Sequence, residues 1–269
     1  MLKKINILLL LIAVTVWGIA LSFKQKIEII VCDVGQGDAI LIQQEGTQSL
    51  IDGGPDNSIL NCLGRHMPFW DREIEIVVLT HPQIDHYGGL ISVSKNYQIE
   101  KFAEYNQESS SQSYLVLKNI LGSNGVEMVK LYKGMEVVNG LMHFDVLNPE
   151  RNQQSKNVND DGIVLLLKTV SFKAIFMADV EKRVSDEIAK NIDVDSVEYI
   201  KVNHHGSING LTENLIKRLK PTTAVISVAK KNRYGHPDAE IIEMLKRNNI
   251  KIERTDEVGD VVIPQKSMQ

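Results

Sequence analysis

The segment 80–89, THPQIDHYGG, places two histidines and an aspartate within six residues of one another, directly after the apolar run IEIVVL. His81, Asp85 and His86 offer two imidazoles and a carboxylate, which are donors that suit Zn²⁺ or Mn²⁺. The glycine pair that follows allows another stretch of backbone to approach closely. A polar turn that happens to contain two histidines is the alternative, but the spacing favours a metal site.

Three other segments carry similar groups where an apolar run ends, and a fourth lies just before a predicted helix. They contain Asp52 in DGG, Asp179 after KAIFMA, the pair His204 and His205 in HHGS, and His236 in GHP. Taken singly, each has an ordinary alternative, such as a turn residue, a helix N-cap for Asp179 or a surface histidine. Functional residues gather on loops that a rigid scaffold holds, so the five segments together predict one shared site.

The elements that must position these groups are short apolar β-type runs with few helices between them. This pattern predicts two packed sheets with helices outside, an α/β (α+β) fold. We expect strands at 27–33, 38–43, 48–52, 74–80, 141–147, 163–169, 172–178, 197–202, 222–228 and 260–264. We expect helices at 111–121, 181–190, 211–219 and 238–248.

The amino-acid composition and the net charge exclude several classes of protein. The 269 residues are 43% hydrophobic and 24% charged, which excludes collagen, low-complexity disorder and a multi-pass membrane protein. The net charge of −4 does not resemble that of a basic nucleic-acid binder, so a polyanionic substrate would need a metal or a few local cations.

Residues 1–26 read as an export segment that precedes a domain over 27–269. Lys3 and Lys4 come before an uncharged, mostly apolar run at 5–23. Either a signal peptidase cleaves after Ala20, or the run stays as a membrane anchor, and both place the domain on the outer face of a membrane or outside the cell. Cys32 and Cys62 could then form a disulfide, or remain two separate buried thiols.

The motifs in their order resemble the metallo-β-lactamase-fold hydrolases, whose hallmark is H-x-H-x-D-H after a strand, with a later Asp and a final His. They resemble most closely the hydrolase domain of ComEC-type competence proteins and its secreted single-domain relatives. The resemblance covers roughly 27–264 and rests on 33–39 (DVGQGDA), 51–54 (IDGG), 159–160 (ND), Asp179, 204–207 (HHGS), 234–237 (YGHP) and 254–256 (RTD) with Gly259.

This resemblance implies a four-layer αβ/βα sandwich that holds one or two divalent ions, Zn or Mn, at one edge. Its first metal site would use His81 and Gln83, its second Asp85, His86 and His236, and Asp179 would bridge the two. Other implied roles are Asp52 bracing the His81 loop, Asp33 and Asp38 shaping the turn and the site floor, and His204 or His205 acting as a further ligand or proton donor.

The chain departs from the family pattern at Gln83, where the family has His or Asp. A Gln carbonyl oxygen is a neutral and weak zinc ligand. This departure is compatible with one tightly held metal, with a more Mn²⁺-like two-metal site, or with a failed enzyme. Ala178 and Gly162 also replace the Gly and Ser that are usual at those positions.

The resemblance implies a metal-dependent phosphodiesterase or nuclease, in which Asp85 orients a water molecule and His204 or His205 protonates the leaving oxygen. The expected partners are a phosphodiester substrate, nucleic acid among them, and a membrane if residues 1–26 stay attached. The cations Lys201, Lys230, Lys231 and Arg233 either hold phosphate or are solvated surface charges. Another hydrolase of this fold (a lactamase, thioesterase or choline-phosphate esterase) and a degenerate, non-catalytic binding protein remain alternatives.

Overall fold

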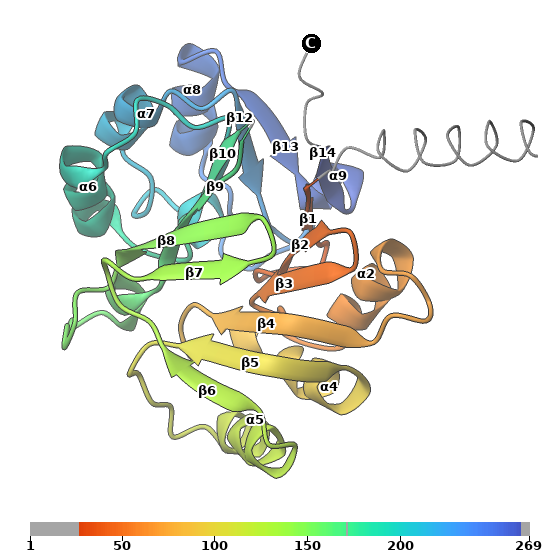
Figure 1. The fold of residues 1–269 in the computed structure, drawn as a ribbon. Helices are drawn as coiled ribbons and strands as arrows, with labels where there is room; N and C mark the ends of the chain where they lie inside the picture. Colours follow the sequence, from red (N-terminus) through yellow and green to blue (C-terminus); the bar gives the residue numbers. More distant parts are fainter. Residues whose placement is uncertain (1–26, 171, 265–269) are drawn as a thin grey trace, which may run out of the picture.

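The structure is a computed structural model that describes residues 27–170 and 172–264. Two seven-stranded sheets face each other, and helices cover the outer face of each (Figure 1). This mixed α/β sandwich confirms the predicted fold class. The expected signal peptide or anchor, residues 1–26, lies outside the described residues. Within the described ranges, no helix is long and apolar enough to cross a membrane.

The first sheet combines antiparallel strands from the chain's beginning and end with parallel strands toward its edge. Its strands, in spatial order, are β14 (Val261–Pro264), β1 (Glu28–Val31), β2 (Ile40–Gln44), β3 (Thr47–Ile51), β4 (Glu73–Leu79), β5 (Gln98–Glu104) and β6 (Glu127–Lys130). Its outer face carries α2 (Ser58–His66), α4 (Leu90–Asn96) and α5 (Gln112–Ser123).

The second sheet mirrors this plan. Its strands, in spatial order, are β13 (Lys251–Arg254), β12 (Thr223–Ile226), β11 (Tyr199–Lys201), β10 (Lys173–Phe176), β9 (Val164–Lys168), β8 (Met142–Asn148) and β7 (Glu136–Asn139). Its outer face carries α6 (Lys182–Asn191), α7 (Glu213–Leu219) and α8 (Ala239–Arg247). Short helices follow single strands: α3 (Ile84–Tyr87), α9 (Thr255–Val258) and the 3₁₀ turns η1 (Val158–Asp161) and η2 (Asn203–Gly206).

Three apolar clusters hold the four layers together. One fills the space between the sheets, and one lies under the helices on each outer face. Strands such as β9, VLLLK, are buried on both faces, so they read as continuous apolar runs rather than as an alternating pattern. Burial of these aliphatic side chains is the main force that joins the layers.

Ten of the strands lie where the apolar runs predict them, but β5, β6, β7 and β13 were not expected. These four strands carry charged residues on exposed positions, as in QIEKFAE of β5 and KIER of β13, so their apolar content is low. The helices α2, α3, α4 and α9 were not expected either, and α3 and α9 have only four residues each. Helices this short lack the two turns that a period of 3.6 residues needs to become visible.

Parallel strands bring the predicted site segments to one edge. Asp52 follows β3 and Thr80 follows β4, which runs parallel to β3. On the other sheet, Asp179 follows β10 and the turn η2 follows β11, again a parallel pair. The carboxyl ends of parallel strands meet at the same edge, so the two halves of the sandwich present their site loops to each other.

Candidate metal centre

Backbone contacts fix three loops of the first sheet against one another. The Gly53 N–H donates to the His86 carbonyl at 2.7 Å, and the Asp38 N–H donates to the Asp85 carbonyl at 3.1 Å. A Cβ atom on Gly89 would lie 2.0 Å from the Gly53 carbonyl oxygen, so any side chain there would push the loops apart. The glycine pair after the histidines therefore permits the close approach that positions Asp85 and His86.

Four side chains from three segments converge between the sheets. Donor atoms of Asp85, His86, Asp179 and His205 all lie within 4.8 Å of one another. Asp179 Oδ2 is 3.3 Å from His86 Nε2 and 3.5 Å from His205 Nε2, which is itself 3.6 Å from Asp85 Oδ2. His86, Asp179 and His205 are buried, whereas Asp85 is half-buried. Two imidazoles and two carboxylates at this spacing form a donor set for a single divalent cation.

Asp52 holds the His86 ring in one orientation. Its carboxylate accepts hydrogen bonds from the Thr80 N–H at 2.8 Å and the Thr80 hydroxyl at 2.7 Å, and lies 2.7 Å from His86 Nδ1. Burial raises the pKa of Asp52, and its contacts with His86 and Thr80 oppose that rise. A proton on Nδ1 leaves Nε2 free to face the four-residue cluster, which is how carboxylates support histidine ligands.

Asp38 and Lys201 form the floor under His205. The Lys201 ammonium donates to Asp38 Oδ2 at 2.6 Å, and both side chains are buried. His205 Nδ1 lies 3.1 Å from the Ser227 carbonyl and 3.4 Å from Asp38 Oδ1, so Nε2 is directed to the cluster. Although burial opposes it, the contacts with Lys201 and His205 lower the pKa of Asp38. Lys201 is therefore committed to Asp38 rather than available for phosphate.

Several buried donor atoms of the cluster are without hydrogen bonds, which is the feature that a metal site requires. Within the cluster, His86 Nε2, His205 Nε2 and Asp179 Oδ1 make no hydrogen bond in the described part of the chain. Beside the cluster, the same holds for His81 Nε2, His204 Nδ1 and His236 Nδ1. Buried polar atoms without partners are rare in folded proteins, because each costs about 1–3 kcal/mol. The unpaired nitrogens of His86 and His205 both face Asp179, at 3.3 and 3.5 Å from its Oδ2, which fits a bound cation.

The charges in the cluster point the same way. Burial favours neutral imidazoles, but Asp179 raises the pKa of His205 to about 10, and Asp179 with Asp52 raises the pKa of His86 well above 6.5. Burial likewise opposes ionisation of Asp179, yet His205 and His86 hold its pKa well below 3.8. The carboxylates are therefore stabilised by nearby positive charge. In the metal-free chain the protonated imidazoles supply this charge, and a bound divalent cation would supply it instead of those protons.

The neighbouring donors His81 and Gln83 form a poorer set. The His81 ring packs 4.1 Å from that of His86, and burial together with His86 lowers the pKa of His81 to about 3, so this imidazole is neutral. The Gln83 amide nitrogen donates to Asn159 Oδ1 at 2.7 Å, which leaves only its carbonyl oxygen for a cation. One imidazole and one neutral amide offer much less than the four-residue cluster does.

The resemblance places His236 with Asp85 and His86, whereas the structure brings His205 to these two residues. His236 Nδ1 lies outside the four-residue cluster and is also buried without a hydrogen bond within the described residues. The His236 ring stacks on Tyr234 at 5.8 Å and lies 5.8 Å from the His204 ring, and burial lowers its pKa. The cause is the turn η2, where His204 and His205 both have left-handed backbone conformations, with φ of 49° and 54°. This turn directs His205 inward and His204 toward the loop of His236.

The structure defines the positions of Asp33 and Asp179. Asp33 is exposed, accepts from the Gly35 N–H at 3.2 Å and lies outside the four-residue cluster. Asp179 does not cap a helix, since α6 begins at Lys182 with Glu181 at its cap position. Ala178, which precedes Asp179, has a φ of 48°, a conformation that glycine adopts without cost. That backbone position explains why glycine is usual there.

Three participants were not among the predicted site residues: Thr80, Asn159 as the partner of Gln83, and the Ser227 carbonyl. Thr80 stands next to His81 in sequence, so a search for groups that brace the metal loop could have found it. Lys201 carried a further signal, because a lysine inside the apolar strand β11 is buried and needs a charged partner.

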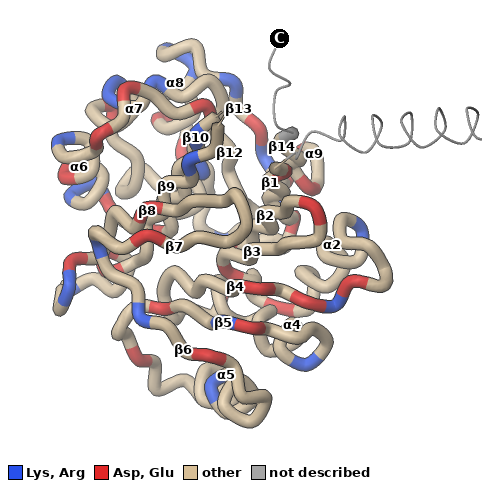
Figure 2. Tube along the Cα trace, in the orientation of Figure 1, with Lys and Arg blue, Asp and Glu red and all other residues tan. Residues whose placement is uncertain are grey.

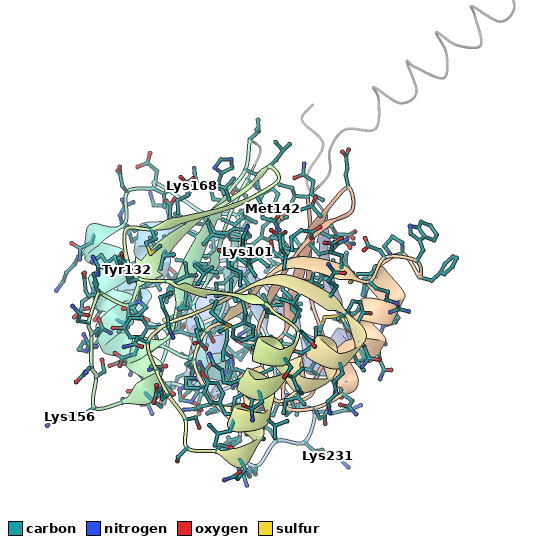
Figure 3. All side chains as sticks on the ribbon, turned by 60° about the horizontal axis from the view of Figure 1, so that its bottom comes forward. Lys101, Tyr132, Met142, Lys156, Lys168 and Lys231 are labelled. Atoms are coloured by element: carbon teal, nitrogen blue, oxygen red, sulfur yellow. A yellow bond between two sulfur atoms is a disulfide. The ribbon has the colours of Figure 1, made fainter. Side chains whose placement is uncertain are left out.

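A cleft of about 580 Å³ opens beside the cluster. Asp85 and Gln83 lie on one wall, and the loop after β12 forms the other. The lining residues are Gln36, Gln83, Ile84, Asp85, Ala229, Lys231, Asn232, Arg233 and Tyr234. Of the cations expected near the site, Lys231 and Arg233 therefore reach this cleft, and Figure 3 shows Lys231 projecting at its edge of the molecule.

Comparison with known proteins agrees with this architecture. Residues 32–113 match the model of the metallo-beta-lactamase superfamily. ComE operon protein 3 of Bacillus subtilis is 27% identical over 90% of this chain, and Recombination protein 2 of Haemophilus influenzae is 24% identical over 96% of it. The chain spans only 33% and 32% of the lengths of these two proteins. A further relative, Competence protein ComA of Neisseria gonorrhoeae, is 24% identical over 88% of this chain.

Solved structures show the same fold at low sequence identity. The metallo-beta-lactamase fold protein YhfI from Bacillus subtilis superposes with a TM-score of 0.62 at 9% identity, covering 88% of this chain and 99% of that one. Zn²⁺-bound PqqB from Methylobacterium extorquens superposes with a TM-score of 0.56 at 10% identity, covering 85% and 87%. The two-sheet sandwich, the match over residues 32–113 and these likenesses show that the chain has the metallo-β-lactamase fold.

Proposed function

We propose that this chain is an extracytoplasmic, metal-dependent hydrolase of phosphodiesters, with one tightly held divalent ion, Zn²⁺ or Mn²⁺. The observation that carries the proposal is the convergence of Asp85, His86, Asp179 and His205 with donor atoms within 4.8 Å. A cation bound there would lower the pKa of a water molecule and offset negative charge on a phosphate.

The chain's own residues divide the remaining tasks. Asp85 is the half-buried member of the cluster and also lines the cleft, so its carboxylate can orient a water molecule and accept its proton. His205 faces the cluster, which leaves His204 as the proton donor to the leaving oxygen. His204 is half-buried, and its ring lies beside that of His236.

The cleft supports a phosphodiester over an uncharged ester. Lys231 and Arg233 project from the loop after β12, and the Arg233 guanidinium lies 5.0 Å from the centre of the Tyr234 ring. Cations together with an exposed aromatic ring suit a phosphate joined to a flat base. The chain as a whole is acidic, so its hold on a nucleic acid would be confined to this cleft.

The disulfide supports the location. Cys32 and Cys62 form a disulfide that joins the end of β1 to α2, with Cα atoms 5.8 Å apart. Disulfides persist in oxidising compartments and are rare in the cytosol. This pairing agrees with the export segment expected from residues 1–26, which would leave the domain secreted or anchored on the outer face of the membrane.

Metal analysis followed by a substrate panel tests the proposal. The purified chain should contain about one equivalent of Zn or Mn, which is the content expected of one four-donor site. It should also hydrolyse bis-p-nitrophenyl phosphate and single-stranded or duplex DNA. Nitrocefin, a thioester and a choline-phosphate ester serve as controls for the other activities of this fold. Turnover of a control without diester cleavage would contradict the substrate class, and absence of both metal and turnover would leave a non-catalytic binding protein.

A further inference from the structure

The loop between α2 and β4 exposes two aromatic side chains. Phe69 is 80% exposed and Trp70 is 73% exposed, with their ring centres 4.8 Å apart in an edge-to-face arrangement. The Asp71 N–H donates to the Pro68 carbonyl at 2.9 Å, which closes the loop into a turn. A defined loop that holds two large aromatic rings in water is a feature of surfaces that bind a partner or a membrane.

This loop lies where the described chain begins. The Gln43 side chain donates both to Glu28, the first residue of β1, at 2.8 Å and to the carbonyl of His66, the last residue of α2, at 3.3 Å. Gln48 next to it donates to Asp71 at 2.9 Å. The aromatic loop and the start of β1 therefore belong to the same end of the sandwich, directly after residues 1–26.

Other exposed apolar side chains gather at this end. The hairpin between β7 and β8 carries Leu141, and its Asn139 donates to the Gln48 carbonyl at 2.9 Å. Val170, 86% exposed, follows β9, whose last residue Lys168 pairs with His143 at the start of β8. We name Phe69, Trp70, Leu141 and Val170 the apolar end.

The metal centre lies at the other end. The apolar loop precedes β4, whereas Thr80 and the metal loop follow it, and a seven-residue strand spans about 20 Å. Figure 3 shows the same separation, with Met142 and Lys168 at one end of the molecule and Lys231 of the cleft at the other. A surface that covered the apolar end would leave the cleft open.

We propose that the apolar end rests in the interface of the membrane in which residues 1–26 are anchored, with Phe69 and Trp70 inserted among the lipid headgroups. The uncharged run at 5–23 is close to the length that spans a bilayer, and only a few residues separate it from β1. Tryptophan and phenylalanine are suited to this depth because they combine large apolar area with low desolvation cost. The inference rests on the proposed extracytoplasmic location and, of its two forms, on the one in which residues 1–26 stay attached as a membrane anchor.

The charges of the aromatic loop predict that its docking does not depend on anionic lipid. Asp71, Glu73 and Glu75 accompany the single cation Arg72 in and after the loop, and Figure 2 shows acidic residues along β4. Anionic headgroups would therefore not attract this loop. Insertion by apolar contact predicts the same docking on phosphatidylcholine vesicles with or without phosphatidylglycerol.

Tryptophan fluorescence tests the proposal in the full chain, since Trp17 and Trp70 are its two tryptophans. The Trp17→Phe variant is reconstituted into vesicles, intact mass confirms that residues 1–20 remain, and brominated phosphatidylcholine serves as the quencher. We expect Trp70 emission to fall at least about twofold, as for a tryptophan at the bilayer interface. The matched control combines W17F, W70F and Leu115→Trp. This variant places its one tryptophan at an exposed position of α5, the helix that follows the end of β5 nearest the metal centre. The emission of this tryptophan should not be quenched.

Three results would overturn the proposal: no quenching of Trp70, equal quenching of both reporters, or shielding of Trp70 that depends on protein concentration without lipid, which indicates a second copy of the chain. Metal content and diester hydrolysis are measured in the same vesicles. Quenching without hydrolysis would refute the proposed enzyme and leave the docking intact, whereas hydrolysis without quenching would do the reverse.

Discussion

The metal loop, residues 81–86, has two halves that differ in the groups that surround their side chains. His81 and Gln83 stand at its start, where His81 is neutral and the Gln83 amide is bound to Asn159. Asp85 and His86 stand four and five residues after His81, and they meet Asp179 and His205 from the opposite sheet. The second half thus combines two carboxylates with two imidazoles, and the first half contributes no charge of its own.

This contrast shows that ligand spacing in a sequence is only part of a metal site. His86 has Asp52 behind it, and His205 has Asp38 with the Ser227 carbonyl, so both rings are oriented before any cation arrives. His81 has the Thr80 hydroxyl, 3.0 Å from its Nδ1, and Gln83 has another amide. Ligands oriented by carboxylates bind a metal more tightly. We therefore expect one strong site in the second half.

Asp179→Asn should have the largest effect, because Asp179 is the carboxylate that faces both His86 and His205. Loss of its charge should reduce metal-dependent hydrolysis by at least about 1,000-fold, since the site would lose both a ligand and the charge that holds the cation. Asp33→Asn, an exposed aspartate outside the cluster, is the matched control. Turnover that survives Asp179→Asn would remove Asp179 from the site.

His205→Ala and His236→Ala compare the observed and the expected ligand directly. His205 faces Asp85 and Asp179, so its loss should weaken metal binding by about 100-fold, while His236→Ala should change it by less than about threefold. Isothermal titration with Zn²⁺ and Mn²⁺ measures both. If the two effects were reversed, His236 would be the ligand and the cluster would rearrange when it binds metal.

The metal-free chain should lose stability as the pH rises. The folded-state pKa of His205, about 10, lies above its ordinary value of 6.5, so its contribution is complete below pH 6.5 and is lost as the pH rises toward 10. Over this range the free energy of unfolding should fall by about 2 kcal/mol or more. Urea unfolding at several pH values, with EDTA or with excess metal, measures the change.

With metal bound, this decrease should disappear, because the cation takes the place of the proton on His205. Equal pH dependence with and without metal would show that His205 is not a ligand. His205→Ala supplies a second control: it removes one of two imidazoles whose pKa is raised, so the curve of the metal-free chain should become less steep, and His86 should account for the remaining slope.

Gln83→His should have the smallest effect and would sharpen the comparison. A histidine beside His81 would give the first half a second imidazole, so affinity for a second zinc ion should rise by about tenfold. Gln36→His, which places a histidine on the same cleft but away from His81, is the control. Unchanged zinc content in Gln83→His would mean that position 83 points away from the first half of the site.

Much of this protein could be predicted from its sequence. Apolar runs located ten strands and four helices, because burial on one or both faces leaves a period in the sequence. The polar residues at the ends of those runs named Asp85, His86, Asp179 and the pair 204–205 as neighbours. Strands with charged residues on exposed positions, such as β5 and β13, were not predicted, because their sequence pattern is that of a polar loop.

Only the tertiary structure decided which histidine meets the carboxylates and which cation is free. His205 rather than His236 reaches Asp179 because the left-handed backbone at 204 and 205 turns one ring inward, and no motif reveals a dihedral angle. Lys201 is withdrawn from the cleft by Asp38, which stands 163 positions earlier in the chain. Sequence determines which chemical groups sit at the strand ends, whereas the direction of each side chain and its partner across the two sheets depend on backbone geometry and packing that exist only in the folded chain.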